Sequence, residues 1–358
     1  MNKLIAIAVF AAASTQAAQV EVANDLDVAR ASETVEVKLK QAGPVVVRDA
    51  TGNEVVSQMI GDDMVIFQAS FGPKETKRFT VTPGTPAQAD SKVYGRFVPE
   101  RADDFAWEND RIAFRIYGPK LMKVEPPSSS GIDVWSKRTN QLIINKWYKS
   151  AKYHSDAGEG CDCYKVGQGR GCGGTGIWND GKLYVSRNFK TWQVLANGPI
   201  RVVFELTYEP WDGGGVNVSE VKRFSLDAGA QLNRVRSTFT IRGADSATVA
   251  VGLTEHKGFK RLAAPERGWI GVWDIADGKD NGHHATGIVF PPAAKVDLKE
   301  ANDSALLLTP VKTNESVDYY VGAGWSKSGF DDSAAWQVYL AEFAARLKSP
   351  LRVTIKGD

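Results

Sequence analysis

The sequence is poor in the residues that build cross-linked or metal-bound folds, with only three cysteines and four histidines in 358 residues. Cys161, Cys163 and Cys172 supply too few ligands at too poor a spacing for a zinc site, and we expect no cofactor. Cys161 and Cys163 lie too close together in the sequence to pair easily with each other. In an oxidising compartment we therefore expect one bridge from either of them to Cys172, which leaves one thiol.

Long apolar runs are also missing beyond the N-terminus. The apolar stretch at residues 4–13 follows Lys3 and precedes small residues, which is the layout of a secretory signal peptide over residues 1–18. It is shorter than the roughly 20 residues that span a bilayer. We therefore expect a protein exported into a bacterial periplasm. Lys plus Arg (44) and Asp plus Glu (42) nearly balance, so charge gives no sign of a nucleic-acid partner or a membrane patch.

Helical periodicity is scarce, and short alternating segments separated by turn residues predominate. About 340 mature residues favour two domains. The first five segments predict a small β-sandwich over residues 19–88, which should end at a stiff linker at residues 83–86. They are residues 20–22, 34–39, 45–47, 64–69 and 78–81.

A second all-β region is predicted over residues 89–358. Several of its candidate strands are longer than usual, which favours two large antiparallel sheets packed face to face. One helix should cover this sandwich, capped by Asp332 or Ser333 and ended by Ser349 and Pro350. Its apolar stripe is Trp336, Tyr339, Leu340, Phe343 and Leu347. The candidate strands are residues 111–117, 141–147, 182–186, 200–208, 217–224, 231–242, 247–253, 269–273, 286–290, 305–309, 317–325 and 351–355.

The stretch from Lys146 to Asn188 collects a large share of the side chains that could do chemistry. Nine of the twenty-four residues from Gly158 to Gly181 are glycine. Such a density excludes the interior of a helix or of a regular strand and predicts a long loop. Because binding and catalytic groups concentrate on loops held by a rigid scaffold, we interpret this segment as the active-site loop.

His154 is the leading catalytic candidate, because imidazole moves protons near neutral pH, and Asp156 could orient its ring. Tyr164 and Lys165 follow in the loop. A base, an acid and a cation beside a sugar carboxylate are the set that an elimination reaction needs. In this scheme His154 or Tyr164 removes the proton, and the other, or a lysine, assists the departing hydroxyl. Arg187 or Arg201 would hold a carboxylate or sulfate.

Three acids recur at Asp156, Glu159 and Asp162, and their role stays open at this level. They could bind calcium, two of them could form the acid and base of a glycosidase, or they could make turns. Arg201 starts a strand, where a structural salt bridge is as probable as contact with the loop. Lys146, Trp147 and Asp162 complete the set of candidate substrate-binding residues.

Several motifs together resemble one exported bacterial family, the family catalogued as domain of unknown function 4861. The motifs extend over most of the mature chain. They are Phe105-Ala-Trp107-Glu108-Asn109-Asp110-Arg111, Gly131-Ile-Asp133-Val-Trp135, Lys146-Trp147-Tyr148, Tyr153-His154 with Gly158-Glu159-Gly160, Asp162, Tyr164-Lys165-Val166-Gly167, and Asn197-Gly198-Pro199-Ile200-Arg201.

The resemblance implies a galactose-mutarotase-like super-sandwich for the large region. It also implies an activity, because this family is associated with polysaccharide-degradation loci and with dehydration of oligosaccharides from ulvan, a sulfated algal polysaccharide. The matching positions are chiefly His154, Glu159, Asp162, Tyr164, Lys165 and Arg201. The two cysteines on either side of Asp162 depart from the family pattern.

We therefore expect a carbon-oxygen lyase, an oligosaccharide dehydratase acting on acidic or sulfated oligosaccharides. His154, Tyr164, Glu159 and Lys165 are the predicted catalytic residues. Two alternatives stay open: a glycoside hydrolase or sugar epimerase on the same fold, and a glycan-binding protein without catalysis. The sequence leaves the oligomeric state open.

Overall fold

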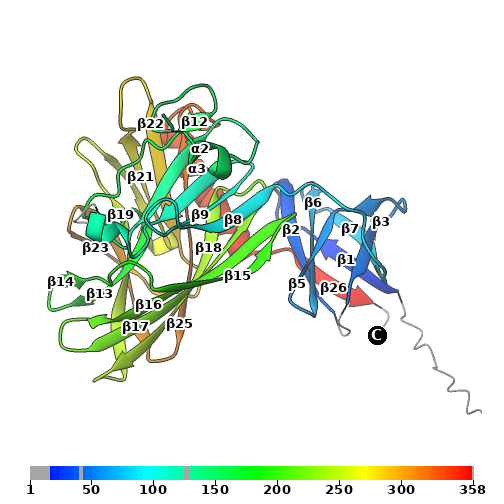
Figure 1. Ribbon diagram of the computed structural model, residues 1–358. Coiled ribbons are helices and arrows are strands. Elements are labelled where there is room, and N and C mark those ends of the chain that lie inside the picture. Colours follow the sequence, from blue (N-terminus) through cyan, green and yellow to red (C-terminus); the bar gives the residue numbers. More distant parts are fainter. Residues whose placement is uncertain (1–16, 40–42, 125–128, 151, 357–358) are drawn as a thin grey trace, which may run out of the picture. The chain divides into compact units, whose positions relative to one another are not determined.

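The computed structural model describes residues 17–39, 43–124, 129–150 and 152–356, and their regular secondary structure is mostly antiparallel β-sheet (Figure 1). The chain forms two compact units. One contains the chain up to Gln88 together with the segment that begins at Leu351, and the other is Ala89–Pro350. The predicted signal peptide lies almost wholly outside the described residues. Within the described ranges, no helix is long and apolar enough to cross a membrane.

The small unit is a β-sandwich of two sheets. Its strands are β1 (Ala18–Ala23), β2 (Arg30–Lys38), β3 (Val45–Asp49), β4 (Glu54–Val55), β5 (Ser57–Ile60), β6 (Met64–Phe71), β7 (Thr76–Pro83) and β26 (Arg352–Lys356). The strand orders are β26-β1-β7-β3-β4 and β2-β6-β5. Alternate side chains such as Val20, Val35, Val37 and Phe67 point inward and form its core, as the period of two along a strand requires.

The last strand corrects the predicted extent of the large region. The sequence placed residues 351–355 in a region that continued to residue 358. The strand exists, but β26 pairs with β1 in the small unit, with Val20 opposite Ile355. Val353 and Ile355 pack against the core of the small unit, so burial of these two side chains decides where the strand belongs.

The large unit contains three antiparallel sheets. Its elements are β8 (Val93–Val98), β9 (Asp104–Asn109), β10 (Ile112–Ile116), α1 (Leu121–Val124), β11 (Ile132–Lys137), α2 (Ile144–Trp147), β12 (Gly160–Cys161), β13 (Cys172–Asn179), β14 (Lys182–Tyr184), β15 (Thr191–Asn197), β16 (Arg201–Asp212), β17 (Asn217–Asp227), β18 (Leu232–Arg242), β19 (Ser246–Thr254), β20 (Lys260–Ala264), the 3₁₀ turn η1 (Pro265–Arg267), β21 (Trp269–Ile275), β22 (His283–Val289), β23 (Asp297–Ala301), β24 (Ser304–Lys312), β25 (Ser316–Trp325) and α3 (Ser333–Lys348).

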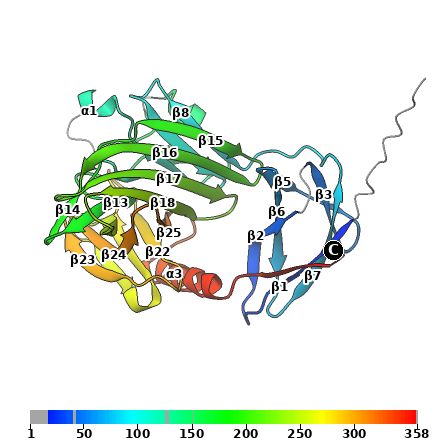
Figure 2. The ribbon, with the colours of Figure 1, turned by 90° about the horizontal axis from the view of Figure 1, so that it is seen from below.

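Two sheets have five strands, β12-β11-β10-β9-β8 and β14-β13-β19-β24-β23. The third has eight, in the order β15-β16-β17-β18-β25-β22-β21-β20. Its long strands β16 to β18 run side by side across the unit (Figure 2). All three sheets contribute to one core, in which Trp107 packs against Phe204 and Phe224. The predicted all-β architecture with large antiparallel sheets is confirmed.

The predicted helix is also confirmed. It is α3, and the carboxylate of Asp332 caps it by accepting a hydrogen bond from the backbone N–H of Ala335. Trp336 and Leu340 are fully buried and lie over β21 and β22. Gly287 on β22 permits this close approach, because a Cβ there would lie 2.6 Å from a methyl group of Leu340.

The segment 141–147 is helical at its end, which corrects the prediction of a strand there. Its last four residues form α2. The buried carboxylate of Glu108 accepts hydrogen bonds from the backbone N–H groups of Ile143 and Ile144. A carboxylate at this position satisfies N–H groups that the first turn of a helix leaves unpaired, so a tertiary contact overrides the strand pattern.

The glycine-rich segment is not a continuous loop as predicted, because it contains β12 and β13. Glycines occur in β13 where neighbours come too close for a side chain. A Cβ at Gly173 would lie 2.3 Å from Val321, and one at Gly174 would lie 2.6 Å from the carbonyl oxygen of Arg170. The glycines here therefore permit close packing of a buried strand.

Candidate functional site

Charged side chains interrupt three apolar strands of the sheet that contains β8 to β12. Arg115 lies at the centre of β10 and pairs with Asp133 of β11 across the sheet, and Asp104 begins the neighbouring strand β9. Side chains alternate along a strand, so Phe114 and Ile116 face the main core while Arg115 points to the other face. This other face is where the candidate site forms.

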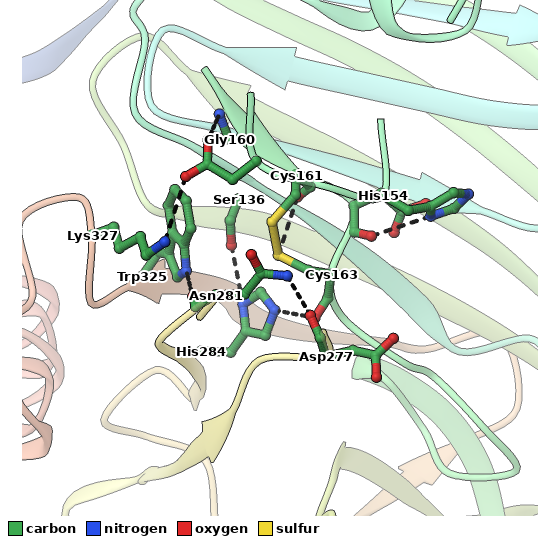
Figure 3. Close-up of a disulfide and its surroundings, with 12 residues drawn as sticks. Ser136, His154, Gly160, Cys161, Cys163, Asp277, Asn281, His284, Trp325 and Lys327 are labelled. Atoms are coloured by element: carbon green, nitrogen blue, oxygen red, sulfur yellow. Dashed lines mark hydrogen bonds and ion pairs between the residues drawn. A yellow bond between two sulfur atoms is a disulfide. The ribbon is translucent and has the colours of Figure 1, made fainter. Parts of the chain in front are cut away.

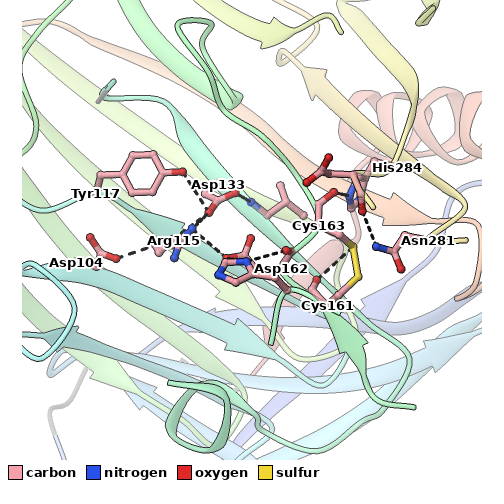
Figure 4. Close-up of polar contacts among 12 residues, drawn as sticks. Asp104, Arg115, Tyr117, Asp133, Cys161, Asp162, Cys163, Asn281 and His284 are labelled. Carbon is pink, nitrogen blue, oxygen red and sulfur yellow. Dashed lines mark hydrogen bonds and ion pairs between the residues drawn. A yellow bond between two sulfur atoms is a disulfide. The ribbon is translucent and has the colours of Figure 1, made fainter. Parts of the chain in front are cut away.

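Arg115 is the hub of a buried ion cluster (Figure 4). Its Nε donates to Oδ2 of Asp133 at 2.9 Å, and its Nη2 donates to Oδ2 of Asp162 at 3.1 Å. Oδ2 of Asp104 is 3.9 Å from the same Nε. Asp162 comes from the loop after β12, so the cluster joins that loop to the sheet. The four side chains are all 6 % exposed or less.

Three carboxyl groups share one guanidinium in this cluster. One positive charge cannot balance three negative charges, and this affects the pKa values of the carboxyl groups. Burial raises the pKa of Asp162 to about 8 and that of Asp104 to about 6, against the opposing effect of Arg115. Burial likewise raises the pKa of Asp133. Burial alone would lower the pKa of Arg115, but Asp162 and Asp133 raise it well above its ordinary value. The cluster therefore holds protons on carboxyl groups at pH values where free aspartate is ionised.

His154 lies at the outer edge of the cluster. Its Nδ1 is 3.2 Å from the backbone carbonyl oxygen of Asp162 and 3.3 Å from Oδ2 of the same residue. The ring packs against the ring of Tyr153, with centroids 4.2 Å apart, yet the side chain is 58 % exposed. One nitrogen is thus held by the protein while the ring remains accessible to a substrate.

Asp156 does not orient His154 as the sequence suggested. Its carboxylate accepts hydrogen bonds from the N–H groups of Gly158 (2.9 Å) and Gly160 (3.1 Å). It also forms ion pairs with Arg138 at 3.0 Å and Lys327 at 3.6 Å. Asp156 therefore shapes the turn that leads into β12, as short acidic side chains commonly do in loops.

The disulfide prediction was wrong. Cys161 and Cys163 are bonded to each other, and Cys172 is a buried free thiol. The two bonded residues have Cα atoms 5.3 Å apart, less than the roughly 6.6 Å that two residues span along a strand. The backbone therefore bends at Asp162, and this bend makes a bridge across one residue possible. The bridge is buried beside Trp325 and Ala276 (Figure 3).

Two histidines hold the loop that carries Asp162 and Lys165, His284 of β22 and His256 in the connection between β19 and β20. His284 donates from Nε2 to the carbonyl oxygen of Cys163 at 2.6 Å, and its Nδ1 lies 3.0 Å from the hydroxyl of Ser136. Nε2 of His256 is 2.6 Å from the carbonyl oxygen of Lys165, and Nδ1 contacts the carboxylate of Asp274. These side chains fix the backbone of the loop at Cys163 and Lys165.

Tyr164 points into the protein, at odds with its predicted role in meeting a substrate. The residue is only 6 % exposed, and its ring lies edge-on to the rings of His256 and His284 at 5.6 and 5.5 Å. Burial raises the pKa of its hydroxyl well above the ordinary value. Lys165 points outward and forms an ion pair with Asp277 at 2.8 Å. Adjacent residues of the loop thus face opposite directions.

Lys146, Trp147 and Glu159 do come together. Nζ of Lys146 lies 2.7 and 2.8 Å from the two carboxylate oxygens of Glu159, and this contact lowers the pKa of Glu159. Trp147 is buried and stacks on Trp135 with centroids 5.7 Å apart. The Lys146–Glu159 pair is therefore a surface feature, and Trp147 is part of the apolar layer below it.

The two arginines predicted to hold an anion have different surroundings. Arg201 forms a two-point ion pair with Asp227, with Nη2 and Oδ2 at 2.8 Å, which is the structural salt bridge that the sequence left open. Arg187 is exposed in the connection between β14 and β15. Asp156, Glu159 and Asp162 likewise have separate cationic partners, which are Arg138 and Lys327, Lys146, and Arg115 respectively. Among the described residues, no cluster of His, Cys, Asp and Glu has the arrangement of a metal site.

Arg115, Asp133 and Asp104 were not predicted as site residues from the sequence. A signal was present, because a charged residue stands inside each of two otherwise apolar runs, Ile112 to Ile116 and Ile132 to Trp135. Buried charges are rare unless they are paired, so two such interruptions in neighbouring strands indicate a shared ion pair.

Solved structures with a similar fold include two proteins from Enterococcus faecalis. One is described as an alpha-mannosidase, with a TM-score of 0.52, and the other as a protein in the glycosyl hydrolase family 38, with a TM-score of 0.53. Each is 9 % identical in sequence, and 95 % of this chain is covered. The chain spans about half the length of these neighbours, 46 % and 47 %. At this identity the likeness concerns the fold alone.

A relative from Formosa agariphila, described as "Uncharacterized protein P7", is 33 % identical over 372 aligned residues. The alignment covers 94 % of this chain and 93 % of the relative. The model of one protein family, described as "Domain of unknown function (DUF4861)", matches residues 22–353. The matched range covers most of both units and the whole candidate site, and the chain belongs to this family.

Proposed function

We propose that this protein is a carbon-oxygen lyase that removes one water from a sugar residue of an acidic or sulfated oligosaccharide, of the kind derived from ulvan. The observation that carries the proposal is the pair of His154 and Asp162, in which an exposed imidazole is held at Nδ1 beside a buried carboxyl group. The family resemblance supports the reaction class. The sandwich shared with an alpha-mannosidase supports a carbohydrate substrate.

The contacts of His154 favour one tautomer. The backbone carbonyl of Asp162 can only accept a hydrogen bond, so Nδ1 must carry the proton that it donates. In the neutral ring Nε2 is then the unprotonated nitrogen, and it is the atom available to act as a base. This assignment holds whether the Asp162 carboxyl group is ionised or protonated, because the backbone carbonyl remains an acceptor in both states.

Dehydration then follows by general acid-base chemistry. Nε2 of His154 would take a proton from the carbon beside the substrate carboxylate, and the electrons of that C–H bond would form a carbon-carbon double bond. The adjacent C–O bond breaks, and the departing oxygen takes the proton back from Nε2 to leave as water. The two oxygens of Asp162 that face Nδ1 accept from the imidazolium formed in between. Lys146 and Lys165, both 67 % exposed, are among the cations of this segment that can face an acidic group.

The carboxyl groups of the site do not favour a glycosidase. Such enzymes use two carboxyl groups on either side of the scissile bond. Here Asp133 and Asp162 are buried against Arg115, and Glu159 is paired with Lys146. Hydrolysis, epimerisation and binding without reaction are therefore outcomes that the experiment must separate from dehydration. Export into the periplasm belongs to the same proposal, since the predicted signal peptide would place the protein among imported oligosaccharides.

Mass spectrometry of ulvan-derived and other uronate oligosaccharides, incubated with the mature protein, tests the proposal. Loss of one water from the product is expected, and His154→Gln should reduce the rate by about 10²- to 10⁴-fold. The matched control is His283→Gln, because His283 is an exposed histidine that stacks on Trp273 and should leave the rate unchanged. A gain of water, an unchanged mass, or full activity in His154→Gln would contradict the proposal.

A further inference from the structure

We propose that the Cys161–Cys163 disulfide is a positioning clamp for the catalytic pair, which holds Asp162 in the one backbone conformation that presents two oxygens to His154. The bridge closes across a single residue, and that residue is Asp162. The consequence for catalysis rests on the proposed function, whereas the geometric role of the bridge does not.

The demand on Asp162 is unusual. Its carbonyl oxygen and its carboxylate oxygen Oδ2 both approach Nδ1 of His154, at 3.2 and 3.3 Å. The same Oδ2 also accepts from Arg115 at 3.1 Å. An ordinary strand residue directs its carbonyl along the sheet and its side chain perpendicular to it. A bend at Asp162 is therefore needed to bring both oxygens to one nitrogen.

The two ends of the bridge are anchored on different sheets. Cys161 is in β12 and pairs with Ser136 of β11. The carbonyl oxygen of Cys163 accepts hydrogen bonds from Nε2 of His284 at 2.6 Å and from the backbone N–H of Asp277 at 2.8 Å. The disulfide thus joins two fixed points, and Asp162 lies between them. The backbone N–H of Asp162 donates to the carbonyl oxygen of Tyr153 at 2.8 Å, which places His154 next to the clamp.

A purely stabilising role fits these positions poorly. The entropy that a disulfide removes from the unfolded chain grows with the length of the closed loop. Here only one residue lies between the two cysteines, so the bond removes little entropy from the unfolded chain. Both cysteines are also buried, at 0 % and 2 % exposure, so packing alone would hold two small side chains there. The geometry points to control of Asp162 as the main effect of the bond.

Two measurements test the clamp. Non-reducing peptide mapping should first show the bond between Cys161 and Cys163; a bond to Cys172 would overturn the inference. In the variant with Cys161→Ser and Cys163→Ser, kcat should fall roughly 10- to 100-fold while KM changes little, because the substrate contacts remain and the base is misplaced. The control is Cys172→Ser, which removes a buried thiol that donates to the carbonyl oxygen of Gly322. It should alter kcat only in proportion to the folded fraction.

Nitrogen-15 NMR of the histidine rings gives a readout that does not need activity. In the wild-type protein the His154 ring should be the tautomer protonated at Nδ1, and in the double variant it should shift toward a mixture of both tautomers. Wild-type protein reduced with a phosphine provides the same comparison if the variant does not fold. An unchanged His154 signal after loss of the bridge overturns the clamp. If the His154 signal changes on loss of the bridge but the wild-type protein dehydrates no oligosaccharide, the clamp is supported and the proposed function is rejected.

Discussion

Asp162 meets His154 with two oxygens, its carbonyl at 3.2 Å and its carboxylate at 3.3 Å from Nδ1. Through the same carboxylate it also accepts from Arg115. A single residue therefore connects a fully buried charge cluster to an exposed imidazole. The buried part can fix the orientation and tautomer of the ring without contacting a substrate, in the way that a carboxylate behind a catalytic histidine does.

This connection predicts a graded response at position 162. Asp162→Asn keeps the shape of the side chain and the backbone carbonyl but replaces the carboxyl group by an amide. The fall in kcat should therefore be limited to about tenfold. Asp162→Ala also removes a partner of Arg115 and should cost more, roughly 100-fold. Steady-state kinetics with thermal unfolding curves of each variant would check this. An equal loss in both variants would mean that His154 needs the carboxyl group itself, and not only a side chain of that shape.

The buried position of Tyr164 predicts that its hydroxyl is dispensable for turnover. Tyr164→Phe should retain kcat within about twofold, because the hydroxyl lies in the core and cannot reach a substrate bound at His154. The comparison variant is Tyr153→Phe, which changes the tyrosine that packs on His154. Rates measured under identical conditions decide the matter. A loss of 100-fold or more in Tyr164→Phe would restore this residue to the active site.

The sequence predicted the architecture better than the directions of side chains. Alternation and turn residues sufficed for the small sandwich, the long strands β16 to β18 and the capped helix α3, since each follows from local periodicity. Local patterns failed at α2, where Glu108 from another strand caps the first turn. They also failed at β26, where pairing with the start of the chain decides the unit.

At the site, His154 and Asp162 were identified by residue type, but their mutual contact was not. The sequence assigned Asp156 to His154 because it is two residues away, whereas the bend at Asp162 brings a residue eight positions away to the ring. Arg115 could not be linked to Asp162 without knowing which strands are neighbours. These relationships depend on tertiary contacts that spacing along the chain does not encode.

The pKa values of His256 and His284 should be shifted in opposite directions from the ordinary value of histidine. Both ring nitrogens of His256 face acceptors, the Asp274 carboxylate and the Lys165 carbonyl oxygen. Only the doubly protonated ring can donate to both, and although burial opposes it, the contact with Asp274 raises the pKa of His256. Burial lowers the pKa of His284 to about 4. NMR titration of the two rings checks this order, and Asp274→Asn should bring the pKa of His256 down. A His284 ring that becomes charged near pH 6.5 would contradict the predicted burial.

Stability should fall as pH rises from 6.5 to 8, and Asp162 should account for part of the fall. Its pKa is about 8 in the folded protein and 3.8 as the ordinary value. In this range the folded state keeps a proton that the unfolded state has lost, so the unfolded state binds fewer protons and the free energy of unfolding decreases with pH. His256, whose pKa is also raised, acts in the same direction, so the wild-type curve alone cannot isolate Asp162. In Asp162→Asn the neutral side chain removes only the Asp162 contribution, and the curve should flatten by on the order of 1–2 kcal/mol across this window.

Below pH 6.5 other groups also change the free energy of unfolding, and some of them raise it with pH while others lower it. Asp104, with a pKa of about 6, makes stability fall as pH rises from about 4 to 6. His284 is neutral when folded, so its contribution is lost as pH falls from 6.5 toward 4. Urea denaturation at several pH values should therefore compare wild-type protein and Asp162→Asn between pH 6.5 and 8, because the contributions of Asp104 and His284 are small in this window and common to both proteins. Asp331→Asn, at an exposed position, is the control. Parallel curves for wild-type protein and Asp162→Asn would show that Asp162 is ionised in the folded state, and the cluster would then hold its protons on Asp104 or Asp133 instead.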